Sequence, residues 1–139
     1  MTDHHDLDRF VQAQSSIYAD AQAELRTGRK QTHWMWFVFP QLAGLGRSET
    51  ARRYAINSRA EAEAYLRHPL LGDRLRECTA LVNAVNERSV AQIFGTPDDL
   101  KFHSCMTLFA TVAPDEGAFA QALQKYFGAV PDPATLSLL

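Results

Sequence analysis

The stretch GRKQTHWMWFVFPQLAGLGRSETARRYAI, residues 28–56, contains both tryptophans of the chain and decides its fold. The middle of this stretch, Trp34–Phe39, is apolar at every position. It has no period-2 alternation, so it does not fit a half-exposed strand, and it is too short to span a bilayer. We therefore expect it to be buried inside the protein. Pro40 ends any helix begun there, because it lacks an N–H and disfavours helical dihedral angles in the residue before it.

A glycine turn and a helix start follow the apolar segment. Gly44 and Gly46 permit a tight turn that exposes the backbone. Ser48 is a good N-cap for a helix through about Ile56, and the start of such a helix presents free N–H groups that suit anions. Arg47 lies beside this turn in the sequence. Two interpretations stay open: the turn is an anion site, or it is a tight turn that closes over the aromatic core.

The rest of the chain predicts further short helices. Ser58 and Glu61 have the spacing of a capping box, and Thr96-Pro97 fits an N-cap followed by the first helical position. Residues 97–112 are apolar nearly all round in their second half, so we expect this helix to be buried. No strand or linker pattern competes with this interpretation. We expect an all-α single domain over residues 1–139, a compact bundle of about seven to nine mostly short helices around the buried helix.

The composition excludes several classes of function. A chain of 139 residues with 46% hydrophobic and 22% charged residues is typical of one globular domain. The net charge of −2 argues against a dedicated nucleic-acid binder, which usually has a basic excess. Cys78 and Cys105 are too few for a disulfide framework, and the N-terminus has no apolar signal segment. We expect a cytoplasmic protein that does not contact the membrane.

Recognisable catalytic and metal motifs are absent from the sequence. There is no dinucleotide fingerprint, Walker loop, HExxH or CxxC. The adjacent histidines His4 and His5 stand near the start of the chain, where such residues are usually solvated. His103 and Cys105 are two residues apart and face opposite ways on a helix, so they do not form a dyad. We therefore expect no metal and no cofactor.

Aromatic and polar side chains of the central stretch are candidates for a ligand site. Trp34 and Trp36 point to different sides of a helix, so at least one belongs to the core and the other is free to stack on a planar ligand. Buried polar groups need partners, and Ser104 stands on the buried helix one turn after Lys101. The candidate ligand-binding residues are Trp34, Trp36, Gln41, Gly44, Gly46, Arg47, Ser48, Tyr54 and Ser104.

Two residues are candidates for catalysis. His33 would act as a general acid or base, with Lys101 or Arg47 stabilising negative charge. Structural interpretations of both remain open. His33 also fits a histidine that bonds a backbone carbonyl at the edge of the core, and Lys101 also fits a salt bridge to Asp98, three residues earlier.

Several motifs along the chain carry a family resemblance. The run His33–Ser48 is joined by DxxxxxQ at 8–14, YAI at 54–56, HPxLGxRL at 68–75, IFGxxDxxK at 93–101, SxMTLF at 104–109 and DxxTL at 132–136. With these motifs the chain resembles the DUF1810 family of uncharacterised bacterial proteins over nearly its whole length. The resemblance implies an all-helical single domain and no established activity. Some members carry a calpastatin-like label, but no inhibitory repeat is apparent in this sequence.

Two functions of different classes follow from these residues. The first is binding of a small phosphorylated or nucleotide-like ligand, an anionic molecule, at a site built around His33–Ser48. This function requires a concave pocket where His33, Gln41 and Lys101 converge. The second is a non-enzymatic protein–protein interaction module in which that stretch is mainly structural. It requires an exposed apolar patch, with a homo-oligomer as one outcome.

Overall fold

Ten helices lie within residues 5–139, the part of the chain that the computed structural model describes. They are α1 (Asp8–Gln14), α2 (Tyr18–Arg26), α3 (Met35–Val38), α4 (Glu49–Arg53), α5 (Arg59–Arg67), α6 (Leu71–Asn83), α7 (Val90–Phe94), α8 (Asp98–Val112), α9 (Gly117–Phe127) and α10 (Pro133–Leu138). The expected all-α fold is confirmed. The expected number of helices was too low, because segments as short as the four residues of α3 form helices of their own. His4 lies outside the described residues.

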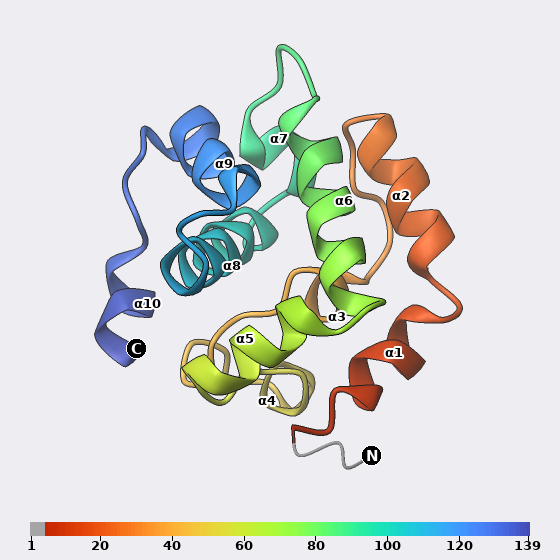
Figure 1. Ribbon diagram of the computed structural model, residues 1–139. Coiled ribbons are helices and arrows are strands. Elements are labelled where there is room, and N and C mark those ends of the chain that lie inside the picture. Colours follow the sequence, from red (N-terminus) through yellow and green to blue (C-terminus); the bar gives the residue numbers. More distant parts are fainter. Residues whose placement is uncertain (1–4) are drawn as a thin grey trace.

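The helix expected at the centre is α8, and Figure 1 shows it enclosed by its neighbours. It packs against α5, α7, α9 and α10. Its buried hydroxyl groups bond within the helix: Ser104 Oγ donates to the Leu100 carbonyl at 3.1 Å, and Thr107 Oγ1 donates to the His103 carbonyl at 2.9 Å. Ser104 Oγ also lies 3.3 Å from Asp132 Oδ2, at the cap of α10. The polar groups of this helix are therefore satisfied by the protein itself.

The last ring of the apolar segment Trp34–Phe39 inserts between α7 and α8. Trp34 and Phe39 are buried, and Phe39 makes edge-on contacts to Phe94 and Phe102 with ring centroids 5.8 and 5.1 Å apart. α3 ends before Phe39, as Pro40 requires. The expected burial of this segment is confirmed for Trp34, Met35, Val38 and Phe39, whereas Trp36 and Phe37 are partly exposed.

One predicted helix is shorter than expected. α4 ends at Arg53 and does not reach Ile56. The backbone of Ile56 bonds across the chain instead, with its N–H donating to Gln41 at 2.8 Å and its carbonyl accepting from Ala43 at 2.7 Å. Together these bonds form an isolated parallel bridge between Leu42 and Ile56. A non-local partner therefore takes the backbone groups that a longer helix would have used.

The start of α8 also differs from the expectation by one residue. The helix begins at Asp98, so Pro97 stands at the N-cap position and not at the first helical position. The Thr96-Pro97 peptide bond is cis. None of the helices in the described part of the chain is long and apolar enough to cross a membrane.

Candidate functional site

Five residues form what we call the tryptophan–lysine cluster: Lys30, Trp34, Trp36, Asp98 and Lys101. Asp98 accepts from Lys30 Nζ at 2.9 Å and from Lys101 Nζ at 3.3 Å, which confirms the local salt bridge of Lys101. Each ammonium also lies over an indole, Lys30 5.2 Å from the Trp34 ring centre and Lys101 4.7 Å from that of Trp36. Both cations are thus paired with groups of the protein.

Trp34 and Trp36 take different roles in this cluster. The Trp34 ring is fully buried, and its N–H donates to Glu24 Oε1 at 3.0 Å. Trp36 is partly exposed and is not among the side chains packed on the buried core. Of the two indoles, the Trp36 ring is therefore the one that offers surface to a ligand.

Glu24 holds the loop that leads into α3. It accepts hydrogen bonds from the backbone N–H groups of Gln31 and Thr32, from the Thr32 hydroxyl and from the Trp34 indole, at 2.6 to 3.0 Å. Burial alone would raise the pKa of the Glu24 carboxyl. The hydrogen bonds from Thr32, Gln31 and Trp34 outweigh burial and lower this pKa below its ordinary value.

The structure does not join the three side chains that were expected to converge. His33 and Arg47 are exposed. In the described part of the chain, no hydrogen bond, ion pair or ring contact links His33, Gln41 and Lys101. Lys101 belongs to the tryptophan–lysine cluster, and Gln41 lies near the glycine turn.

Both glycines of the turn have a structural reason to be glycine. Gly44 has a φ of +101°, a conformation that side-chain-bearing residues rarely adopt. A Cβ added at Gly46 would lie 2.5 Å from the Cβ of Ala51, so the turn rests directly on α4. Ser48 Oγ accepts from the Ala51 N–H at 3.1 Å and caps this helix as expected. The turn is therefore packed and capped by its own chain.

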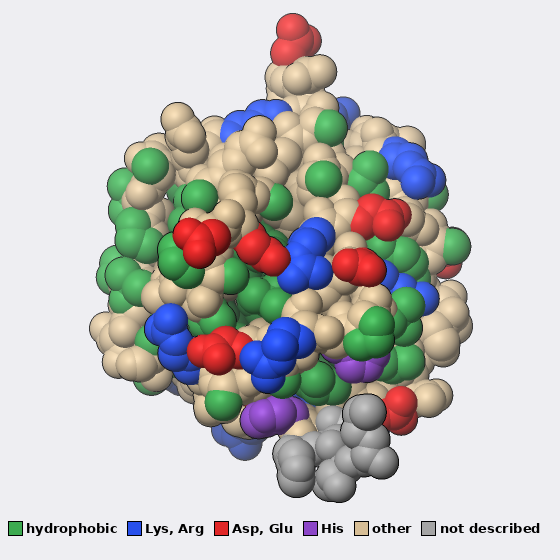
Figure 2. All heavy atoms as spheres, viewed as in Figure 1, with side chains coloured by type: hydrophobic (Ala, Val, Ile, Leu, Met, Phe, Trp, Pro, Cys, Tyr) green, Lys and Arg blue, Asp and Glu red, His purple; other side chains and the backbone are tan. Residues whose placement is uncertain are grey.

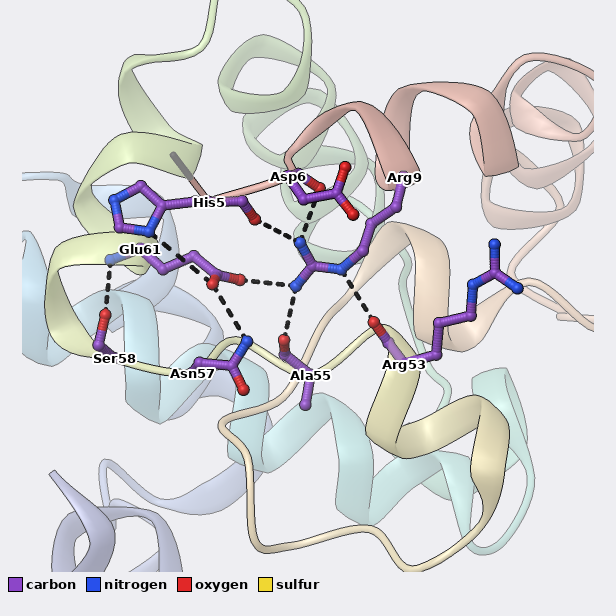
Figure 3. A network of polar contacts seen from close by, with 8 residues as sticks. All are labelled: His5, Asp6, Arg9, Arg53, Ala55, Asn57, Ser58 and Glu61. Carbon is purple, nitrogen blue, oxygen red and sulfur yellow. Dashed lines mark hydrogen bonds and ion pairs between the residues drawn. The ribbon is translucent and has the colours of Figure 1, made fainter. Parts of the chain in front are cut away.

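A polar cavity lies where the start of α1, the end of α4 and the start of α5 meet. Its volume is about 480 Å³. Figure 3 shows its side chains around a central guanidinium group, with α1 on one side and the chain between α4 and α5 on the other. The lining residues are His5, Asp6, Arg9, Arg53, Asn57, Ser58 and Glu61.

Arg9 is the scaffold of this cavity. Its guanidinium has five N–H bonds to donate, and all of them are used by the protein. The acceptors, at 2.6 to 2.9 Å, are the carbonyl oxygens of His5, Asp6, Arg53 and Ala55 and the carboxylate of Glu61. Arg9 therefore ties α1 to the segment after α4 and has no N–H left for a ligand.

Glu61 forms the floor of the cavity. Its side chain is buried, with Oε2 accepting from Arg9 at 2.8 Å and Oε1 accepting from Asn57 Nδ2 at 3.3 Å. His5 Nδ1 lies 4.0 Å from Oε1. The Ser58 hydroxyl caps α5 as expected, but the Glu61 carboxylate turns to Arg9 and does not complete the predicted capping box. Since a carboxylate oxygen accepts two hydrogen bonds, Oε1 keeps capacity for a donor in the cavity.

Arg53 supplies a cation at the edge of the cavity. In Figure 3 its side chain runs outward, away from the Arg9–Glu61 pair. Its guanidinium lies 5.5 Å from the ring centre of Tyr54. Among the described residues it forms no ion pair, and it is exposed. The positive charge of Arg53 is therefore available to an anion, in contrast to that of Arg9.

Sequence reasoning missed the residues that build this cavity. Glu61 stands four residues before Tyr65 and one before Ala62, both of which are buried. This spacing places a carboxylate on the apolar face of a helix, where it needs a cation or donors. That pattern is the signal that could have identified Glu61. Arg9 has no comparable signal in its own helix.

The surface adds no strongly charged patch on the face shown in Figure 2, where acidic and basic side chains alternate. Within residues 5–139, no group of three or more histidine, cysteine, aspartate or glutamate side chains is arranged to hold a metal ion. Charge on this face therefore does not point to one class of partner.

Comparison with known proteins identifies a family and one solved relative. A family model described as "Protein of unknown function (DUF1810)" matches residues 4–139. The crystal structure of the conserved hypothetical protein Rv1873 from Mycobacterium tuberculosis is 56% identical in sequence, with a TM-score of 0.97 over 99% of this chain and 98% of that one. No curated protein is detectably similar to the chain. With the match extending over essentially its whole length, the chain belongs to the DUF1810 family.

Proposed function

We propose that this protein binds a small phosphorylated polyol, such as a sugar phosphate, with the hydroxyl groups in the polar cavity and the phosphate at Arg53. The observation that carries the proposal is the division of one cavity into two parts. A buried carboxylate with spare acceptor capacity forms its floor, and at its edge stands an exposed guanidinium that forms no ion pair with the described residues. A sugar phosphate carries both kinds of group, hydroxyl donors for the carboxylate and an anion for the guanidinium.

The charges inside the cavity favour hydroxyl groups over a phosphate. Asp6 and Glu61 are carboxylates, and the charge of Arg9 is already paired with Glu61. A phosphate placed between them would meet two like charges, whereas a hydroxyl group can donate to Glu61 Oε1 and accept from His5. The phosphate is therefore assigned to the outward Arg53 side chain, where bidentate hydrogen bonds are possible.

The proposal keeps the ligand class expected from the sequence and moves its site. The ligand is still a small anionic molecule, and the compartment is still the cytoplasm, in keeping with the free thiols of Cys78 and Cys105. The catalytic roles of His33 and Lys101 stay predictions, since neither residue lines this cavity. The proposal is one of binding.

A thermal-shift titration tests the proposal with ribose 5-phosphate, glucose 1-phosphate, ribose and inorganic phosphate. A sugar phosphate at about 100 times its Kd should stabilise the protein by about 2.7 kcal/mol, and ribose or phosphate alone should shift it less. Arg53→Gln should abolish the shift. Arg52→Gln is the matched control, because Arg52 is exposed on the same helix and does not line the cavity. No shift with any sugar phosphate, or an unchanged shift in Arg53→Gln, would contradict the proposal.

A second function is favoured by one observation, the exposure of large apolar side chains near the C-terminal helices. In Figure 2 apolar side chains gather at the left edge, on the side of α9 and α10. The exposed residues are Val130, Leu136, Leu138 and Leu139 in or beside α10, and Leu100 in α8. Such side chains suit a non-enzymatic interaction module, with a second copy of the chain as the simplest partner. Light scattering after gel filtration tests it, and a monomer at every concentration would exclude self-association.

A further inference from the structure

A row of partly exposed aromatic rings starts beside Arg53 and leads away from it. The ring of Tyr54 meets that of Phe37 with centroids 4.8 Å apart, and Phe37 meets Trp36 with centroids 6.0 Å apart. We call Trp36, Phe37 and Tyr54 the ring row. A cation stands at each of its ends, Arg53 over Tyr54 and Lys101 over Trp36.

The ring row is more exposed than the core rings around it. Trp34, Phe39 and Phe10 are fully or almost fully buried, whereas all three rings of the row are partly exposed. Trp36 at the far end is not packed on the core, and Lys101 covers its ring at 4.7 Å. Lys101 and Phe37 contact the Trp36 ring, and the part of this ring that stays exposed is the surface that we assign to stacking on a planar group.

Contacts within the protein therefore connect the cavity to Arg53 and Arg53 to the ring row. Arg53 joins them, because its backbone carbonyl accepts from Arg9 in the cavity and its guanidinium lies over Tyr54. In this order, the cavity binds hydroxyl groups, Arg53 binds an anion, and the ring row stacks on a planar group. A ligand that uses all three parts has a sugar at one end, phosphate groups in the middle and a planar base at the other end.

We propose that the ligand class is the nucleoside diphosphate sugars, with the terminal sugar in the cavity, the diphosphate at Arg53 and the base stacked on the ring row at Trp36. This inference rests on the proposed function, because the sugar and phosphate positions are those assigned above. It adds the base and a second phosphate. Base stacking on aromatic rings tolerates different bases, so the ring row selects a planar group and the cavity selects the sugar.

Titration calorimetry of four ligands tests the inference: ribose 5-phosphate, AMP, ADP-ribose and UDP-glucose. ADP-ribose should bind at least about tenfold more tightly than ribose 5-phosphate, a difference of about 1.4 kcal/mol that one stacked base can supply. Trp36→Leu should bring the two affinities to within about threefold while leaving ribose 5-phosphate unchanged. Phe127→Leu is the matched control, because Phe127 is a partly exposed ring outside the row.

A spectroscopic measurement on the unmodified protein tests the same inference without a substitution, so its result does not depend on whether Trp36→Leu folds correctly. ADP-ribose should change the tryptophan emission through the partly exposed Trp36, and ribose 5-phosphate should leave it unchanged.

The outcomes separate the two proposals. If ribose 5-phosphate binds and ADP-ribose binds no more tightly, the ring row is not part of the site and this inference is overturned while the sugar phosphate proposal stands. The inference is also overturned if the preference for ADP-ribose survives in Trp36→Leu. If none of the four ligands binds, both proposals fail.

Discussion

Glu24 and Glu61 are two carboxylates that hold the chain together, and they do so in opposite ways. Glu24 accepts four hydrogen bonds from the single segment 31–34 and so closes a local loop. Glu61 accepts hydrogen bonds from Arg9 on another helix and from Asn57, and it can accept a further hydrogen bond from a donor in the cavity. A carboxylate whose donors all come from one loop is structural, whereas one with an open side at a cavity is a candidate to meet a ligand.

The largest expected effect on stability distinguishes the two tryptophans of the tryptophan–lysine cluster. Trp34→Ala should lower the free energy of unfolding by about 4 kcal/mol, because it empties a fully buried indole position and leaves Glu24 without one donor. Trp36→Ala, the control in a partly exposed position, should cost less than about 1 kcal/mol. Urea unfolding measures both. Equal losses would mean that Trp36 is as structural as Trp34 and would weaken its assignment to a ligand.

A smaller loss is expected at the cavity. Arg9→Ala should lower the free energy of unfolding by about 3 kcal/mol, since it leaves the buried carboxylate of Glu61 without its cation. Arg53→Ala should change stability by less than about 0.5 kcal/mol, because the guanidinium of Arg53 forms no ion pair among the described residues. Denaturant titrations of the two variants provide the comparison. A large loss in Arg53→Ala would show that its charge is needed for folding and is not free for a ligand.

The smallest effect concerns the pH dependence of the Glu24 loop. Because the folded-state pKa of Glu24 lies below its ordinary value of 4.5, its contribution to stability is fully present above that pH and is lost as the pH falls through the lowered pKa. Glu24→Gln should therefore be less stable than the unmodified protein at about pH 6, and the difference should shrink as the pH falls below 4.5. Glu87→Gln, in an exposed turn, is the control. A difference that stays constant over this range would contradict the assignment.

The parts of the fold that local sequence determines were predicted well. The all-round apolar pattern identified α8, the apolar run predicted a buried segment that includes Phe39, and the N-caps at Ser48 and Ser58 are in place. The Lys101–Asp98 salt bridge followed from a spacing of one helical turn. Each of these features depends on residues within about four positions of one another, a range over which periodicity and capping are informative.

The features that the sequence did not predict depend on distant residues. Arg9 and Glu61 are 52 positions apart, and no pattern in either helix indicates the other. Ile56 left its predicted helix because its backbone bonds to Gln41 and Ala43. The glycines and tryptophans of the central stretch stand out in the sequence for their chemistry, but packing accounts for Trp34 and Gly46 in the structure. A stretch of unusual composition can therefore reflect tight packing in the core as well as a ligand site.

The bridge between Leu42 and Ile56 has a consequence for how this chain can change in length. It holds the two ends of residues 43–55 beside each other, so this segment forms a closed loop that starts and ends at the same point of the fold. Because the two ends are held together, an insertion at the exposed positions of this segment, such as Arg47 and Ser48, adds little loop-closure entropy. Arg53 is carried by this segment, at the edge of the cavity. An insertion at those exposed positions would therefore reshape the surface near the cavity and leave in place the contacts that Tyr54 and Ala55 make with the rest of the chain.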